Sequence, residues 1–117
     1  MNLDEVLSLL SEKNFPFRES RRPSPNSVNS TLAIDQTALV TPRFTIVFIY
    51  EYENQEALNK DRMTLYKKFK KNYFDGEVVE IITGNIYMVT SKDKGEGEGE
   101  GESKLEKQLN EIFLSEK

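Results

Sequence analysis

The sequence contains neither cysteine nor histidine, and these two absences exclude much of the usual chemistry of active sites. Without thiolates and imidazoles, the chain lacks the common structural zinc ligands, the thiol nucleophile and the histidine general base. Glycine-rich phosphate loops and the GxSxG and HExxH motifs are also missing. We therefore expect a non-enzymatic protein without a metal or cofactor. The alternative is an enzyme that uses Asp, Glu, Lys and Tyr alone.

Long apolar runs are absent as well. No stretch approaches the roughly 20 apolar residues that span a bilayer. The first ten residues include Asp4 and Glu5 and have no basic segment of the kind that opens a signal peptide. The sequence as written predicts a cytoplasmic protein. The alternative is an extracytoplasmic or lipid-anchored protein whose signal segment has been removed.

The size and composition indicate one domain, residues 1–117, with a modest core. Hydrophobic residues make up 37% of the chain and include seven Phe and five Tyr. The net charge of −4 comes from 16 basic and 20 acidic residues, and this mixture gives no overall attraction to nucleic acid or anionic membranes. Locally the signs separate: residues 60–71 hold six Lys or Arg against one Asp, and residues 95–117 hold seven Glu against three Lys.

The N-terminal segment LDEVLSLLSEK has the apolar spacing of an amphipathic helix. Its apolar residues recur at positions i, i+3, i+4 and i+7, namely Leu3, Val6, Leu7 and Leu10. Asn2 and Glu5 have the spacing of a capping box. Asn14 tolerates the left-handed conformation that ends a helix, and Pro16 prevents its continuation.

Strands are expected in the middle of the chain. The polar segment 18–30, RESRRPSPNSVNS, predicts a flexible loop or an exposed edge. Two weak strands, Thr31–Ile34 and Ala38–Val40, are expected around a turn at Asp35-Gln36. Residues Phe44–Tyr52 are apolar on both faces, which predicts a central strand that is covered on both sides.

The segment EALNKDRMTLYKKFKK, residues 56–71, predicts a second helix. Leu58, Leu65 and Phe69 fall within about 40° of one another on it, and Lys60, Lys67 and Lys71 fall on the opposite side. A hairpin follows, with strands Val78–Thr83 and Ile86–Thr90. Its Gly84-Asn85 turn fits type I′ or type II′.

The tract KGEGEGEGE, residues 94–102, predicts an extended mobile loop, because glycine is flexible and the glutamates repel one another. Ser103 and Glu106 then open a last helix whose apolar stripe contains Leu105, Leu109, Ile112 and Phe113. These elements predict an α+β fold: a mainly antiparallel sheet of four or five strands packed by two or three helices. The expected order is α-β(β)-β-α-β-β-α.

The segment YKKFKKNYF, residues 66–74, interleaves lysines with aromatic residues and has two interpretations. As an anion or nucleic-acid site, it would use Lys60, Lys67, Lys70 and Lys71, with Tyr66 or Tyr73 stacking on bases and Arg21 and Arg22 of the polar loop contributing. As an ordinary amphipathic helix, it would turn its aromatic residues inward and its lysines to water. The helical phase favours the second interpretation.

Three further acidic features also have two interpretations. Asp61 and Arg62 lie toward the apolar stripe of the second helix. They could mark a cleft, or Arg62 could extend along an apolar rim or pair with a strand carboxylate such as Glu51 or Glu53. Glu51, Glu53 and Glu56 complement the positive N-terminus of this helix without catalysis. The Gly-Glu tract is expected to be a linker rather than a calcium loop, because calcium loops place their ligands on a rigid turn.

Three segments, LDEVLSLLSEKNF, VFIYEYENQEAL and GNIYMVTSKD, resemble a class of small bacterial α+β domains that often occur as exported lipoproteins. The resemblance implies an α+β fold at the cell envelope and carries over no catalytic residue. The leading hypothesis is therefore a binding or interaction module with a protein partner, associated with the envelope. The alternative is a nucleic-acid-binding accessory protein that uses the basic helix 60–71.

Overall fold

The computed structural model describes residues 2–20, 32–41, 46–72, 78–91 and 104–114. Their elements follow the order α-β-β-β-α-β-β-α: α1 (Leu3–Glu12), β1 (Arg18–Ser20), β2 (Asp35–Val40), β3 (Ile46–Glu51), α2 (Gln55–Asn72), β4 (Val78–Thr83), β5 (Ile86–Ser91) and α3 (Lys104–Leu114). The five strands form one sheet in the order β1-β2-β3-β5-β4, and every neighbouring pair is antiparallel. The α+β prediction is confirmed.

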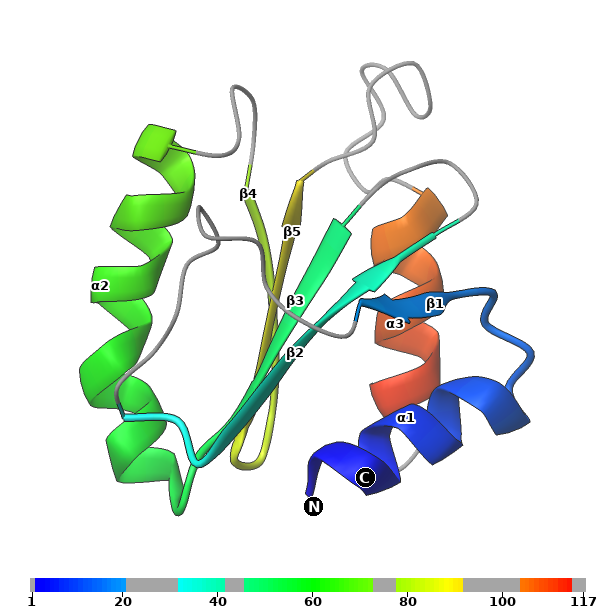
Figure 1. Ribbon diagram of the computed structural model, residues 1–117, viewed down its shortest axis with the longest axis horizontal. Helices are drawn as coiled ribbons and strands as arrows, with labels where there is room; N and C mark the ends of the chain where they lie inside the picture. Colours follow the sequence, from blue (N-terminus) through cyan, green and yellow to red (C-terminus); the bar gives the residue numbers. More distant parts are fainter. Residues whose placement is uncertain (1, 21–31, 42–45, 73–77, 92–103, 115–117) are drawn as a thin grey trace.

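The sheet separates two layers of helices (Figure 1). Helix α2 covers one face, and α1 and α3 cover the other. The central strand β3 alternates between the two sides, as a strand with both faces covered must. Its Val47 and Ile49 pack toward α1 and α3, whereas Phe48 and Tyr50 pack toward α2.

The two cores differ in composition. The core under α1 and α3 is mainly aliphatic, and the core under α2 contains Phe48, Tyr50, Tyr52, Phe69 and Tyr87. All six residues predicted to be buried by the second and third helices are buried: Leu58, Leu65, Phe69, Leu109, Ile112 and Phe113. The packing expected of these helices is therefore confirmed.

Helix α1 begins and ends at the residues that the sequence indicates. The Asn2 side chain accepts a hydrogen bond from the Glu5 backbone N–H at 2.8 Å, and the Asn2 backbone N–H donates to the Glu5 carboxylate at 2.9 Å. At the other end Asn14 has a φ of 59°, and the Phe15 N–H donates to the Leu10 carbonyl at 2.9 Å. This is a Schellman-type end.

The structure corrects the prediction for the segment before the central strand. Asp35 and Gln36 do not form a turn: they begin β2 and pair with Glu51 and Tyr50 of β3. Residues 32–34 are not a strand, although the Ile34 N–H donates to the Glu51 carbonyl at 2.8 Å. A single six-residue strand is favoured because β3 offers an equally long partner, so pairing continues through the polar pair.

The first residues of the segment 18–30, predicted to be a loop or an exposed edge, lie at an edge of the sheet. Arg18–Ser20 form β1, which pairs with the end of β2 as an edge strand. Residues 21–30 and the Gly-Glu tract 94–102 lie outside the described residues. In the parts of the chain that the structure describes, no helix is both long and apolar enough to cross a membrane.

The β4–β5 hairpin has the predicted two-residue turn. Gly84 has a φ of +58°, and Asn85 is not among the described non-glycine residues with positive φ, so the turn is type II′ rather than type I′. Asn85 also fixes the hairpin to the end of β3. Its side-chain amide donates to the Tyr52 carbonyl at 2.8 Å, and the Tyr52 N–H donates to the Asn85 carbonyl at 2.9 Å.

Candidate functional site

The orientation of α2 is determined by its buried residues. The Phe69 ring lies 4.8 Å from the Phe48 ring and 6.4 Å from the Tyr50 ring, measured between centroids. The Asn54 side chain caps the helix start by accepting a hydrogen bond from the Ala57 N–H at 2.9 Å. Because this side of α2 packs on the sheet, its opposite side is turned to solvent.

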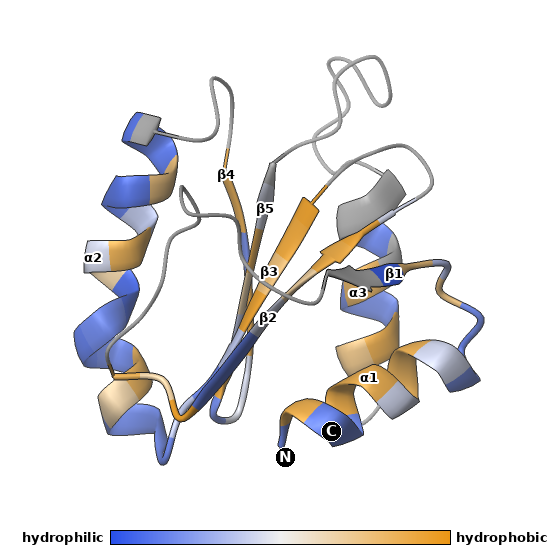
Figure 2. Ribbon diagram, in the orientation of Figure 1, coloured by the Kyte–Doolittle hydropathy of each residue, from blue (hydrophilic) through white to orange (hydrophobic). Residues whose placement is uncertain are grey.

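Five exposed lysines occupy the solvent side of α2, and we call them the basic face: Lys60, Lys67, Lys68, Lys70 and Lys71. The helix has a predominantly hydrophilic outer surface in Figure 2. The structure therefore brings together all four lysines of the predicted anion site on one helix. Arg21 and Arg22, the other two predicted contacts, lie outside the described residues.

Two side chains modify the basic face. Lys60 Nζ lies 3.7 Å from a carboxylate oxygen of Glu56, one helical turn away, but both side chains are largely exposed and such pairs contribute little. Lys70 Nζ lies 5.9 Å from the centre of the Tyr66 ring. The half-buried Tyr66 therefore has a cation over one ring face. Tyr73, the other predicted stacking residue, lies outside the described residues.

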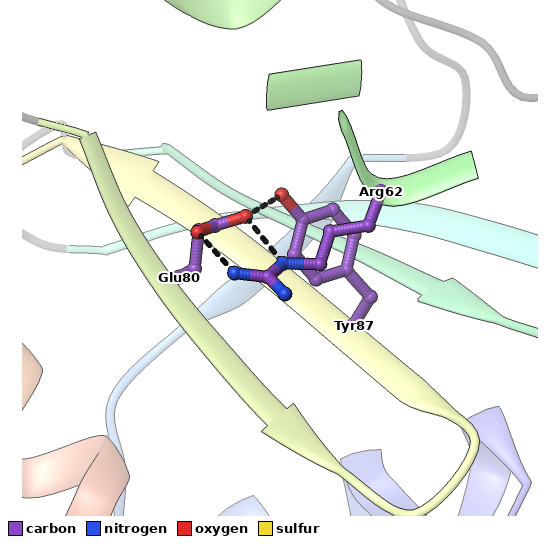
Figure 3. Close-up of polar contacts among 3 residues, drawn as sticks. All are labelled: Arg62, Glu80 and Tyr87. Carbon is purple, nitrogen blue, oxygen red and sulfur yellow. Dashed lines mark hydrogen bonds and ion pairs between the residues drawn. The ribbon is translucent and has the colours of Figure 1, made fainter. Parts of the chain in front are cut away.

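Arg62 joins α2 to the hairpin through a three-residue cluster (Figure 3). Its Nε and Nη2 atoms lie 3.1 and 3.2 Å from the two carboxylate oxygens of Glu80 on β4. The Tyr87 hydroxyl on β5 donates to the same carboxylate. Arg62 pairs with a strand carboxylate, as predicted, but that carboxylate is Glu80 rather than Glu51 or Glu53, because Arg62 lies on the side of α2 that faces β4 and β5.

The cluster shifts the ionisation of two of its members. Burial, together with the hydrogen bond to Glu80, raises the pKa of the Tyr87 phenol far above its ordinary value near 10. The hydrogen bond to Glu80 and the charge of that carboxylate raise the pKa of Arg62. Arg62 is therefore a permanent cation, and Tyr87 is a neutral hydrogen-bond donor at physiological pH.

Asp61 has a different partner. Its carboxylate accepts a hydrogen bond from the Tyr52 hydroxyl at 2.7 Å, and the carboxylate is buried against the end of β3. Asp61 thus contacts the residue that follows β3, whereas Arg62 contacts β4, and together they attach α2 to the sheet at two points. Among the described residues there is also no group of three acidic side chains that could hold a metal ion.

The acidic residues before α2 divide between two helices. Glu51 does not face α2: its carboxylate accepts a hydrogen bond from the Leu3 N–H at 2.7 Å and so complements the N-terminus of α1. Asn54 caps α2, and Glu56 lies in its first turn as predicted. Glu53 is exposed just before the helix.

Sequence reasoning missed the partners Glu80 and Tyr87. A signal was present, because Glu80 is the one charged residue in the strand sequence VVEIIT. A carboxylate in such a strand needs a partner when its side of the sheet is covered. Which helix supplies that partner depends on the strand order, and local spacing does not contain that information.

Searches against protein-family models, curated proteins and solved structures found no match for the chain.

Proposed function

We propose that this chain is a non-enzymatic binding module that holds an acidic partner protein on the basic face of α2. The observation that supports the proposal is the concentration of positive charge on one exposed surface. Helix α2 contains six basic and two acidic residues, a net charge of +4, whereas the whole chain has a net charge of −4. A local field opposite in sign to the rest of the protein attracts and orients an acidic partner.

The basic face is also rigidly presented. Phe69 and Leu65 are completely or almost completely buried beneath it, and Arg62 and Asp61 attach the helix to the sheet. Lysines on a fixed helix keep a constant spacing. Binding of a partner therefore does not carry the entropic cost of ordering the backbone of α2. Among the described lysines of this face, Lys60 has a nearby carboxylate, and that pair is exposed and weak.

The test uses fluorescent poly-L-glutamate as the acidic probe at low ionic strength. We expect Lys67→Glu/Lys71→Glu to weaken binding by at least about tenfold, because it reverses the field of the basic face. The matched control is Lys13→Glu/Lys107→Glu, which makes the same change in net charge at exposed positions on α3 and at the end of α1. The control should stay within about twofold of the wild type. Equal losses in both variants, or no binding by the wild type, would contradict the proposal.

The rival function is a nucleic-acid-binding accessory protein that uses Lys60, Lys67, Lys70 and Lys71. The observation in its favour is the half-buried Tyr66 among these lysines, because an aromatic ring beside cations is typical of single-strand binding. Titration with a fluorescent oligonucleotide distinguishes the two functions. Affinity that survives about 150 mM salt, falls steeply above it and is lost in Lys67→Glu/Lys71→Glu would favour the rival.

We further propose that the module works at the cell envelope, as the resemblance to exported bacterial domains implies. The test is fractionation of the source cells with an antibody against the native protein. Recovery with the envelope fraction supports this location. Recovery in the cytosolic fraction alone contradicts it and leaves the binding proposal intact.

A further inference from the structure

Strand β4 forms one edge of the sheet and is six residues long, whereas β1 at the opposite edge has three. In the part of the chain that the structure describes, no strand pairs with the outer side of β4. Hydrogen-bonded and non-hydrogen-bonded pairs alternate along an antiparallel ladder, so every second residue of β4 directs its N–H and C=O away from β5. These groups form a template for another strand.

Strand β4 lacks the features that usually protect an edge. It contains no lysine or proline, and its pairing with β5 runs from Val78–Ser91 to Thr83–Ile86 without a bulge. Val79 and Ile81 are buried against the helices on one face. Its one charge, Glu80, is held by Arg62 and Tyr87, so it is not a free charge that repels incoming strands.

The flank of α2 lies beside this edge and determines the chemistry of an incoming strand. Arg62 reaches the Glu80 carboxylate on β4 with 39% of its side chain still exposed (Figure 3). Tyr66 and Lys70 follow Arg62 along the helix, and the Lys70 ammonium lies over the Tyr66 ring. Glu80 offsets the charge of Arg62, and within the residues that the structure describes no strand carboxylate forms an ion pair with the lysines of the basic face. Acidic side chains are therefore the complement of this flank.

We propose that an extended, acidic segment of the partner protein adds to the outer edge of β4 as a sixth strand. Side chains of a strand alternate between its two faces, so its acidic residues occupy every second position and face α2. Backbone hydrogen bonds to β4 supply affinity, and Lys70, the lysine of the basic face that follows Arg62 and Tyr66 along this flank of α2, selects the acidic sequence. This inference rests on the proposed function, because the basic face is what selects the partner.

A second copy of this chain is a poorer occupant of the same edge. Pairing β4 with β4 across a two-fold axis would place two α2 helices on the same face of the joined sheet, next to the axis. Each helix has a net charge of +4, and like charges at such an interface disfavour association. Charge complementarity thus favours an acidic strand over a homodimer.

The experiment compares three acetylated peptides of related composition by fluorescence titration. The first alternates Glu and Val, the second is the same peptide with every backbone amide N-methylated, and the third places the same residues in separate Glu and Val blocks. We expect the alternating peptide to bind at least about tenfold more tightly than the other two, because only it makes the strand hydrogen bonds in register with the lysines. Lys70→Glu should weaken binding of the alternating peptide, and Lys107→Glu on α3 should not.

Amide hydrogen exchange measured by NMR gives an independent readout. With the alternating peptide bound, the outward-facing amides of β4 should exchange at least about tenfold more slowly, while those of β1 keep their rates. Equal binding of all three peptides without protection of β4 would overturn strand addition and leave the proposed function standing. Failure of all peptides and of poly-L-glutamate would overturn both. Protection of β4 by dimerisation without peptide would replace the inference with a homodimer.

Discussion

At the scale of single residues, the Arg62–Glu80–Tyr87 cluster connects α2 to both strands of the hairpin that follows it in the chain. One carboxylate accepts hydrogen bonds from a guanidinium and from a phenol. The half-exposed guanidinium keeps contact with water, whereas Tyr87 is fully buried. A neutral donor is therefore needed at the buried position, and the raised pKa of Tyr87 keeps it neutral.

Replacement of Tyr87 by Phe should lower the free energy of unfolding near neutral pH by about 1–3 kcal/mol, because a hydrogen bond to a charged group is lost. The loss should shrink as the pH rises above about 10. There the unfolded wild type releases the phenol proton while the folded state retains it, so wild-type stability falls by up to about 1.4 kcal/mol per pH unit. Urea denaturation of both proteins between about pH 8 and 11 measures the effect.

The control for this prediction is Tyr66→Phe, which removes a phenol from α2 outside the Glu80 cluster. Subtracting each variant from the wild type at the same pH removes the titration of the lysines. A stability difference between wild type and Tyr87→Phe that stays constant up to pH 11 would contradict the role assigned to the Tyr87 proton.

At the scale of secondary-structure elements, sequence patterns predicted the three helices and the hairpin because each has a local cause. Asn2 with Glu5, the apolar stripes and the Gly84-Asn85 turn all act over a few residues. Asn54 is a missed cap that the same rule would have found, since it directly precedes the helical segment. The predicted strand Ala38–Val40 is present, but the expected turn at Asp35-Gln36 was wrong, because pairing with β3 extends this strand back to Asp35.

Truncation of the two cores should show how strongly the helices depend on the sheet. We expect Phe69→Ala and Ile112→Ala each to cost about 2–5 kcal/mol, since both side chains are buried on opposite faces of the sheet. The measurement is the denaturation midpoint with an unchanged m-value. Met63→Ala is the control, because Met63 is 54% exposed on α2 and should cost less than about 0.5 kcal/mol. Midpoints near that of the wild type for both core variants would refute the packing.

At the scale of the whole molecule, the fold class was predictable but the strand order was not. Alternating helices and strands indicated α+β, whereas placing β5 beside β3 and β4 at the edge depends on contacts between distant segments. The lysines of the candidate site were found from helical phase alone. Helical phase did not identify the partner of Arg62 or the open edge of β4, because both depend on the position of β4 in the sheet.

Shortening the Gly-Glu tract tests whether the segment between β5 and α3 does more than connect them. Replacing residues 95–102 with a shorter Gly-Ser link should change the free energy of unfolding by less than about 1 kcal/mol, because closure entropy depends only weakly on loop length. Calcium should leave the denaturation midpoint of the wild type unchanged. A loss of several kcal/mol in the shortened variant, or stabilisation of the wild type by calcium, would assign the tract a specific role.

The unequal composition of the two cores gives the molecule separate reporters for its two sides. The chain has no tryptophan, and every tyrosine within the described residues lies on α2 or in the core beneath it: Tyr50, Tyr52, Tyr66 and Tyr87. Fluorescence of these tyrosines therefore follows the α2 side, whereas the methyl groups of Leu10, Leu39 and Ile112 follow the α1 and α3 side. If the unfolding curves from the two signals coincide, the two sides of the sheet unfold together as one cooperative unit. If the curves separate, the signal that changes first identifies the layer of helices that detaches first.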